Sequence, residues 1–407
     1  MTQSSQRKGR AHGGLRTGFF ELFGKWQLIR FGALVLSMFL LADCAGLRLE
    51  RFKGSPEDWT TFGGNPSRTN SSISVVRPPF STAWTYNALS GISTTLLVRD
   101  SVVIVSTLQG ELQTVNILNG KRLGYMVLES AVAGTPTLDA SVLYVPIASG
   151  TETLFALDLN ESQRLWTASP GAIETSPLVN DRFVYVTTLK GTLCCLDKKS
   201  GAEVWTFRTQ GKEDRKPVRS SPSTDGKSIF FGGDDGYIYA VEAQKGELQW
   251  KYKTSASIFA TPVTISGSVI VGSLDGNLYC LGTANGDLRW VFRTGSKLYG
   301  AVSATDRSVF FGSADGICRA VDLQTGNERW RFASKSVIDS APLIVNDLLY
   351  VGSLDKTLYV LNTEDGKEVW RYAAEGRIRV SPVVWRGLLL ITSEDKYVTA
   401  LKPEEPA

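Results

Sequence analysis

The chain has 407 residues, 43% of them hydrophobic, with 39 glycines and 10 tryptophans, which is typical of a globular protein with a large core and many tight turns. Residues 1–43 hold six of the 44 basic and two of the 40 acidic residues, so the rest of the chain has 38 of each and the net charge of +4 belongs to the N-terminal tail. A body without net charge argues against nucleic-acid binding. The single histidine, His12, also lies in the tail, which excludes histidine catalysis and histidine metal ligation from the body.

The first predicted element is the apolar segment 31–42, which follows Lys25 and Arg30. It has the length of a signal-peptide core and is shorter than the ~20 residues of a membrane-spanning helix. The next residues, Leu41-Ala42-Asp43-Cys44, resemble the lipobox of bacterial lipoproteins, except that Asp43 replaces a small residue. The resemblance implies a lipid on Cys44 and, because Ala45 is not the Asp that retains such proteins in the inner membrane, sorting to the outer membrane. An inner-membrane signal anchor and a soluble periplasmic protein are the alternatives.

We expect four regions along the chain. Residues 1–43 form a basic n-region and a signal or anchor segment, residues 44–58 a linker, residues 59–402 the folded body, and residues 403–407 a short tail.

The body consists of a repeat of about forty residues. A tryptophan marks the same position in seven copies, and Gly124 takes that position in a degenerate copy. The marked positions are 40, 42, 39, 45, 40, 40 and 40 residues apart, so eight units cover the chain after about residue 80. The tryptophans are Trp84, Trp166, Trp205, Trp250, Trp290, Trp330 and Trp370.

Each unit contains four short segments rich in β-branched and aromatic residues, separated by turns with Gly, Asp or Asn. Four strands per unit predict a β-propeller blade, and a closed ring of blades buries both apolar faces of every sheet. The last unit ends at Lys402 without an outer strand, so we expect the strand that carries Trp84 to complete it. The sequence therefore predicts an all-β fold, a single eight-bladed β-propeller of four-stranded antiparallel blades closed by an N-terminal strand.

The tryptophans are predicted to pack between blades. Each full copy has the order Ala320, Asp322, Gly326, Trp330, in which Gly allows the positive φ of a tight turn and Asp caps that turn. Truncation of a buried tryptophan to alanine costs roughly 3–5 kcal/mol. We therefore interpret the repeated tryptophans as structural docking residues rather than binding residues.

This A-x-D-x-x-T-G-x-x-x-W pattern resembles the tryptophan-docking motif of the pyrroloquinoline-quinone-type propeller family, and the segment from Trp59 to Thr69 is similar to the opening segment of its members. The resemblance covers residues 59 to about 402 and implies the eight-bladed fold. Individual copies depart from the pattern at Gly124, Glu161-Ser162, Lys245 and Gly282.

The same family includes enzymes, so a quinoprotein dehydrogenase that binds pyrroloquinoline quinone and calcium, or a quinone sensor, is the alternative function. The resemblance implies that such enzymes have a vicinal disulfide, for which Cys194 and Cys195 are the candidates, a calcium ion held by Glu, Asn and Asp, a catalytic Asp and long loops. Here the loops are short, and Cys195 and Cys280 occupy the small-residue position of the motif. We predict no catalytic residue, no metal site and no cofactor.

Alignment of the units three residues before the recurring proline gives a ring of positions at the predicted channel entrance. The ring contains charges of both signs and two aromatic residues. Its members are Ser93, Ala133, Glu174, Arg219, Phe259, Tyr299, Asp339 and Arg379. Two interpretations stay open: ion pairs that solvate a channel mouth, and a pocket for a small ligand or a peptide.

The 45-residue spacing reflects a charged insertion in residues 210–220, on the face where this ring opens. Loops on a rigid scaffold frequently bind partners, so we predict partner contacts at Lys212, Arg215, Lys216 and Arg219. A solvated insertion without a function is the alternative.

A lipid-anchored propeller of this size without a catalytic set resembles the BamB family of outer-membrane lipoproteins. The resemblance implies a non-catalytic scaffold on the periplasmic face of the outer membrane, which binds protein partners of the barrel assembly machinery and offers strand edges to incoming proteins. A propeller that binds polysaccharide or another envelope component is a third interpretation.

Overall fold

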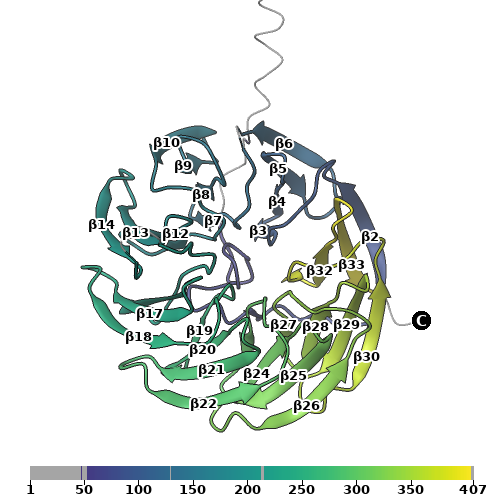
Figure 1. Cartoon of the computed structure of the whole chain (residues 1–407). Coiled ribbons are helices and arrows are strands. Elements are labelled where there is room, and N and C mark those ends of the chain that lie inside the picture. Colours follow the sequence, from purple (N-terminus) through teal and green to yellow (C-terminus); the bar gives the residue numbers. More distant parts are fainter. Residues whose placement is uncertain (1–46, 48–52, 129, 212–214, 405–407) are drawn as a thin grey trace, which may run out of the picture. The chain divides into compact units, whose positions relative to one another are not determined.

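The structure is a computed structural model that describes residues 47, 53–128, 130–211 and 215–404. Eight β-sheets follow one another in chain order around a central axis (Figure 1), which confirms the predicted eight-bladed propeller. We number the sheets blades 1 to 8. No helix in the described part of the chain is long and apolar enough to cross a membrane.

The first four blades are regular, and their strands run antiparallel from the axis to the rim. Blade 1 contains β3 (Leu97–Arg99), β4 (Val102–Ser106), β5 (Glu111–Asn116) and β6 (Arg122–Val127). Blade 2 contains β7 (Thr137–Asp139), β8 (Val142–Pro146), β9 (Leu154–Asp158) and β10 (Gln163–Ala168). Blade 3 contains β11 (Leu178–Val179), β12 (Phe183–Thr188), β13 (Thr192–Asp197) and β14 (Glu203–Arg208). Blade 4 contains β15 (Ser223–Thr224), β16 (Ser228–Gly232), β17 (Tyr237–Glu242) and β18 (Leu248–Lys253).

The other four blades complete the ring. Blade 5 contains β19 (Val263–Ile265), β20 (Ser268–Gly272), β21 (Asn277–Gly282) and β22 (Leu288–Arg293). Blade 6 contains β23 (Ser303–Ala304), β24 (Ser308–Gly312), β25 (Ile317–Asp322) and β26 (Glu328–Ala333). Blade 7 contains β27 (Leu343–Val345), β28 (Leu348–Gly352), β29 (Thr357–Asn362) and β30 (Glu368–Ala373). Blade 8 contains β31 (Val383–Trp385), β32 (Leu388–Thr392), β33 (Tyr397–Pro403) and β2 (Phe80–Asn87).

The ring is closed in blade 8, where β2 from the N-terminal part of the chain pairs antiparallel with β33 and places Trp84 opposite Ala400. This confirms the predicted closing strand. One strand was not predicted: β1 (Ser71–Ser72) pairs parallel with β27 and gives blade 7 a fifth, innermost strand.

The repeated tryptophans lie in the outer strands and contact the next blade. Five indole N–H groups donate to a backbone carbonyl in the turn between the third and fourth strands of that blade, at 2.7–2.9 Å. In each of these five cases the indole ring lies on a turn glycine whose φ is 68–73°, and a Cβ on that glycine would come within 2.5–2.7 Å of the ring. The glycine is therefore required by the close contact as well as by its φ. The donors are Trp84, Trp166, Trp250, Trp290 and Trp330.

Trp205 and Trp370 depart from this arrangement. The Trp205 N–H is buried without a partner, because the Tyr185 hydroxyl donates to the carbonyl of Ala243 in the turn that Trp205 faces. Trp370 meets the chain break in blade 8, where the ring of Phe80 packs edge-on against it with centroids 5.0 Å apart.

The segment from Trp59 to Ser72, which we call the strap, runs inside the ring along the inner strands (Figure 1). Its backbone forms hydrogen bonds of 2.8–3.2 Å with the inner strands of six blades. These pairs are Trp59 with Val98, Thr60 with Leu138, Pro66 with Thr224, Ser67 with Thr264, Thr69 with Ala304, and Asn70 with Ile344. Since Arg68 bonds blade 3 and β2 joins blade 8, residues 59–87 contact all eight blades.

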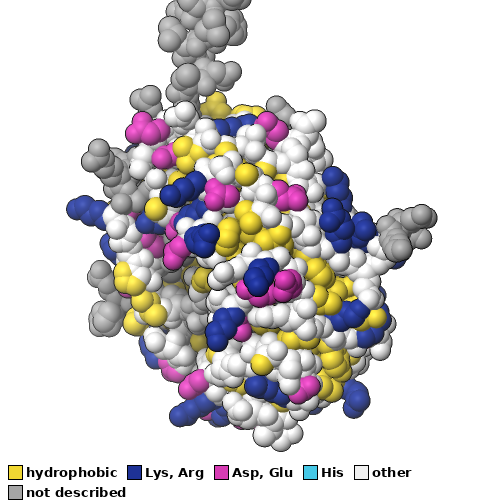
Figure 2. Space-filling view, turned by 90° about the vertical axis from the view of Figure 1, so that its left-hand side faces the viewer, with side chains coloured by type: hydrophobic (Ala, Val, Ile, Leu, Met, Phe, Trp, Pro, Cys, Tyr) yellow, Lys and Arg dark blue, Asp and Glu magenta, His cyan; other side chains and the backbone are white. Residues whose placement is uncertain are grey.

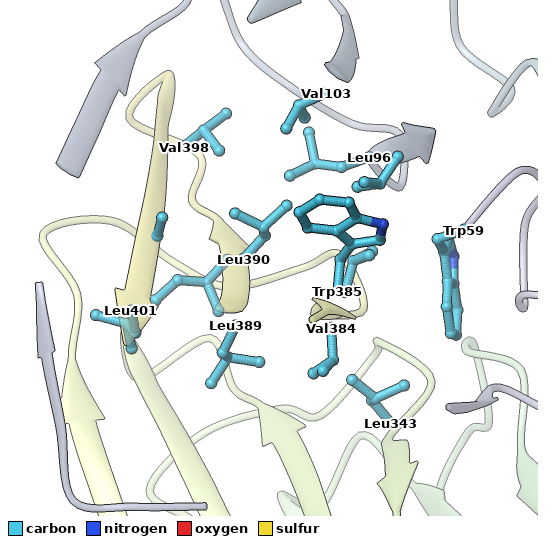
Figure 3. Packing of buried hydrophobic residues seen from close by; sticks show 14 of the residues in the cluster. Trp59, Leu96, Val103, Leu343, Val384, Trp385, Leu389, Leu390, Val398 and Leu401 are labelled. Carbon is cyan, nitrogen blue, oxygen red and sulfur yellow. The ribbon is translucent and has the colours of Figure 1, made fainter. Parts of the chain in front are cut away.

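The strap also supports a large apolar cluster where blades 7, 8 and 1 meet. Trp385 lies between leucines and valines of blades 8 and 1, and Trp59 of the strap belongs to the same cluster (Figure 3). The indole N–H of Trp385 donates to Asp58 at 3.1 Å, which fixes the start of the strap to the inner strand of blade 8.

Candidate partner-binding site at the channel mouth

The ring of predicted channel-entrance positions lies four residues before the first residue of each inner strand, on the face that we call the mouth. None of its eight residues is buried, whereas the residue before each one is an aliphatic side chain exposed by 0–4%. The alternation follows from strand geometry, since successive side chains point to opposite sides. The buried neighbours are Ile92, Val132, Ile173, Val218, Ile258, Leu298, Ile338 and Ile378.

Arg219 is the centre of the first charged cluster at the mouth. It forms an ion pair with Asp234 in the turn between β16 and β17, and its Nε lies 3.5 Å from Glu174 of the preceding blade. Its guanidinium also lies over the ring of Phe259, 5.6 Å from the centroid. Three predicted ring residues therefore meet here, together with Asp234, which was not predicted.

Arg379 is the centre of an equivalent cluster. It pairs with Glu394 in the turn between β32 and β33 and, at 3.2 Å, with Asp339 of the preceding blade. The spacing along the chain is the same in both clusters, since each acid in the turn follows its arginine by 15 residues. Arg377 lies 3.9 Å from Glu394 and extends this cluster.

The two clusters lie on opposite sides of the mouth, because blades 3 and 4 are four blades away from blades 7 and 8 in a ring of eight. Between them, blades 5 and 6 present Phe259 and Tyr299, and the Tyr299 side chain is 40% exposed. On the other side, blade 1 presents Leu89 and Leu108, which are 63% and 48% exposed. The mouth therefore alternates charged and apolar sectors.

The acids closest to the core have shifted acidities. Burial raises the pKa of Asp234 and of Asp339 above the ordinary aspartate range, although the neighbouring Arg219 and Arg379 act in the opposite direction. One carboxylate oxygen of each is buried without a hydrogen-bond partner. Each cluster therefore contains an acid that is incompletely neutralised by its arginine.

The charged insertion follows β14 and leads to Arg219. Lys212, one of the predicted partner contacts, lies outside the described residues. Arg215 is half-buried against Gly191, in the turn between β12 and β13, and Lys216 is exposed. The structure therefore brings Arg219 into a polar cluster. Lys216, three residues earlier in the chain, is exposed to solvent.

The strap bonds the inner strands at the end of the channel away from the mouth. The guanidinium of Arg68 is 1% exposed and donates to the carbonyl oxygens of Pro177, Pro222 and Phe62 and to the hydroxyl of Thr61 at 2.6–3.2 Å. Burial lowers the pKa of Arg68 to about 9. This position was not predicted, because a lone arginine in a Gly- and Pro-rich segment has the pattern of an exposed loop.

The cysteines do not fit the quinone site of the family's enzymes. Cys194 and Cys195 are buried free thiols in β13, the third strand of blade 3. They point to opposite faces of the strand, into the core between blades 2 and 3 and the core between blades 3 and 4. Burial raises the pKa of Cys195 to about 12 and also raises that of Cys194. Within the described ranges, no group of three or more Asp, Glu, Cys or His side chains is placed to hold a metal ion.

Charges around the outside of the ring follow no single sign. In the side view of Figure 2, basic and acidic side chains are interspersed over the visible surface. Hydrophobic side chains on outer strands, among them Leu165, Val204, Leu248 and Leu288, are 44–50% exposed.

The chain was compared with known proteins. The family model described as outer membrane protein assembly factor BamB matches residues 120–332 and 314–405. The BamB protein of Yersinia pestis is 29% identical over 123 residues, which are 30% of this chain and 31% of that protein. The crystal structure of BamB from Moraxella catarrhalis superposes with a TM-score of 0.69 at 20% identity, covering 80% of this chain and 100% of that one.

An enzyme is also similar. The quinohemoprotein alcohol dehydrogenase of Comamonas testosteroni is 28% identical over 170 residues, which are 36% of this chain and 24% of that enzyme. Its structure superposes with a TM-score of 0.70 at 13% identity, covering 90% of this chain and 85% of that one. The chain thus aligns with less than a third of the length of either curated relative, and at these identities the structural matches show the shared fold alone. The family model, which spans residues 120–405, shows that the chain belongs to the family of the outer membrane protein assembly factor BamB.

Proposed function

We propose that this chain is a non-catalytic scaffold that supports the assembly of β-barrel proteins into the outer membrane, and that a protein partner docks on the mouth. The observation that carries the proposal is the pair of acid–arginine–acid clusters at opposite sides of the mouth, in a chain whose family model is that of BamB. The proposal includes a lipid on Cys44, which lies outside the described residues, and attachment to the periplasmic face of the outer membrane.

The composition of the mouth supports protein binding. Protein interfaces are enriched in Arg and Tyr, and their energetic centres combine aromatic anchors with desolvated charges. Here Arg219 and Arg379 are 38% and 46% exposed although each pairs with two acids, so they can exchange part of that pairing for groups of a partner. The positions of Arg215 and Lys216 in the insertion that leads to this face add basic groups at its edge.

The strap supports the proposal of a docking surface at the mouth. It runs along the inner strands inside the ring, where Arg68 bonds the carbonyl oxygens of Pro177 and Pro222, so the face left without the strap is the mouth. The proposed partner therefore lies across the mouth. Its surface is expected to match two charged sectors separated by apolar ones, which fixes its orientation more than its affinity.

The test is a pull-down of the full chain from membranes in mild detergent, with component identification against the barrel assembly machinery. We expect recovery of a machinery component by the wild type, and at least tenfold less with Arg219→Glu and Arg379→Glu together. Arg331→Glu is the matched control, because Arg331 is 62% exposed on the outer strand of blade 6 and pairs with one acid there. Recovery of no machinery component, or equal recovery by the mouth variant, would contradict the proposal.

The enzyme alternative has its own test. Purified full chain is titrated with pyrroloquinoline quinone and calcium while tryptophan fluorescence and dye reduction with an alcohol are followed. The scaffold proposal predicts no saturable quenching and no turnover, and micromolar binding with turnover would replace it.

A further inference from the structure

The seam between blades 1 and 2 lacks the docking arrangement that five other seams have. Gly124 in β6 stands opposite Thr114, where Trp84 and its equivalents stand in other blades. In the next blade, Ser162 occupies the turn position that is Gly201 or Gly326 elsewhere, and its φ is 53°. A Cβ at this turn position collides with a docked indole, so the serine fits only where the indole is absent. The two departures are one coordinated change.

Without the indole, this seam contains buried polar atoms that have no hydrogen-bond partner. In the turn of blade 2, the Asn160 side-chain oxygen and the Ser162 hydroxyl are buried without a hydrogen-bond partner. Elsewhere the indole ring covers this turn and its N–H bonds a carbonyl there, as Trp290 does with Leu323 at 2.9 Å. A buried polar atom without a partner costs about 1–3 kcal/mol, so a seam of this kind needs compensation from apolar packing.

Leu47 supplies apolar packing at this seam. Its side chain is 0% exposed, and it belongs to a cluster built otherwise from blade 1 and blade 2, against which Met126 of β6 packs. Full burial of a leucine contributes about 1.5–3 kcal/mol. Leu47 precedes the strap by 12 residues in the sequence, and it packs at the seam that has Gly124.

We propose that Leu47 replaces the missing indole as the wedge between blades 1 and 2.

The first test is hydrogen–deuterium exchange of the full chain in detergent micelles, comparing Leu47→Ala with the wild type. We expect at least tenfold faster exchange in β5, β6, β9 and β10, and unchanged exchange in β21 and β22 of blade 5. Leu118→Ala is the matched control, because Leu118 is 68% exposed in a blade 1 turn. Unchanged exchange at the seam, or faster exchange spread evenly over all blades, would overturn the proposal.

A second test rebuilds the missing wedge. In the double variant Gly124→Trp, Ser162→Gly, a docked indole makes Leu47 dispensable, so adding Leu47→Ala is expected to change seam exchange by less than twofold. An undiminished effect of Leu47→Ala in this background would contradict the wedge role. Cys44→Ser separates the two proposals: seam protection persists if Leu47 docks, whether or not the variant leaves the membrane fraction.

Discussion

The two ends of the central channel are built from the same kind of strand but in opposite ways. At the strap end, the charged group of Arg68 is buried and donates to four acceptors from three parts of the chain, whereas the indole N–H of Trp59 is buried without a partner. At the mouth, charges are half exposed, and Asp234 and Asp339 each keep an unpartnered oxygen. The strap end therefore stabilises the ring, while the mouth retains unused interaction capacity, which is a property of binding surfaces rather than of cores.

The largest effect on stability is expected at Arg68. Arg68→Ala leaves the carbonyl oxygen of Pro222 without the guanidinium donor and the carbonyl oxygen of Pro177 with the Thr137 hydroxyl alone, and hydrogen bonds to charged groups contribute about 1.5–3 kcal/mol each. We expect the free energy of unfolding to fall by at least about 3 kcal/mol in urea denaturation. Arg68→Lys keeps the positive charge but loses the planar guanidinium with its several N–H donors. Its free energy of unfolding should therefore lie between those of Arg68→Ala and the wild type. A loss below about 1 kcal/mol would show that the strap end does not depend on this side chain.

A smaller effect is expected at Asn70, also in the strap. Its side-chain amide, 1% exposed, donates to the carbonyl oxygens of Ala341 and Pro342, and its φ is 53°. Asn70→Ala should lower the free energy of unfolding by about 2–3 kcal/mol, because it loses these bonds and keeps a strained backbone. Asn70→Gly removes the backbone strain but does not restore the lost hydrogen bonds. Equal stability of Asn70→Ala and the wild type would remove the distinction between the two channel ends.

At the mouth, the free energy of unfolding is expected to depend on pH through the protonation of Asp339. Since burial raises the folded-state pKa of Asp339 above the ordinary value of 3.8, the cost of its charge is fully present above the folded pKa and disappears as the pH falls to 3.8. The wild type should therefore gain stability relative to Asp339→Asn on acidification from pH 7 toward about 4. Urea denaturation at several pH values measures this difference. If the wild type instead lost stability relative to Asp339→Asn over this pH range, the attraction of Arg379 for the charged carboxylate would outweigh the cost of its burial.

The smallest effect on stability is expected at Tyr299. Because the side chain is 40% exposed, Tyr299→Ala should change the free energy of unfolding by less than about 1 kcal/mol. Partner recovery should nonetheless fall by about tenfold or more, the effect of removing an interface anchor. If Tyr299→Ala strongly lowered the free energy of unfolding but left partner recovery unchanged, the mouth would be a stabilising element rather than a binding surface.

The blades and their closure could be predicted because each depends on local periodicity that repeats eight times. The mouth ring could also be predicted, since one register aligns all inner strands. The acids that complete the clusters carried a usable signal: Asp234 and Glu394 stand where Leu108, Leu274 and Leu354 stand in other blades. The path of the strap carried none, because its backbone hydrogen bonds to six inner strands do not depend on the side chains, and the partners of Arg68 and Asn70 are distant in the sequence. The roles of Leu47 and Ser162 could be recognised only in the structure. It shows that the position without a Trp and the turn without a Gly lie in the same seam.

The most direct test of the docking surface is site-specific photo-crosslinking in the cell envelope, with the crosslinker placed at Tyr299 on the mouth or at Leu118 on the opposite face. Both positions are exposed, at 40% and 68%, so folding is not disturbed by either change. The account predicts a crosslink from position 299 to a component of the barrel assembly machinery and none from position 118. A crosslink to such a component from position 118 alone would contradict it.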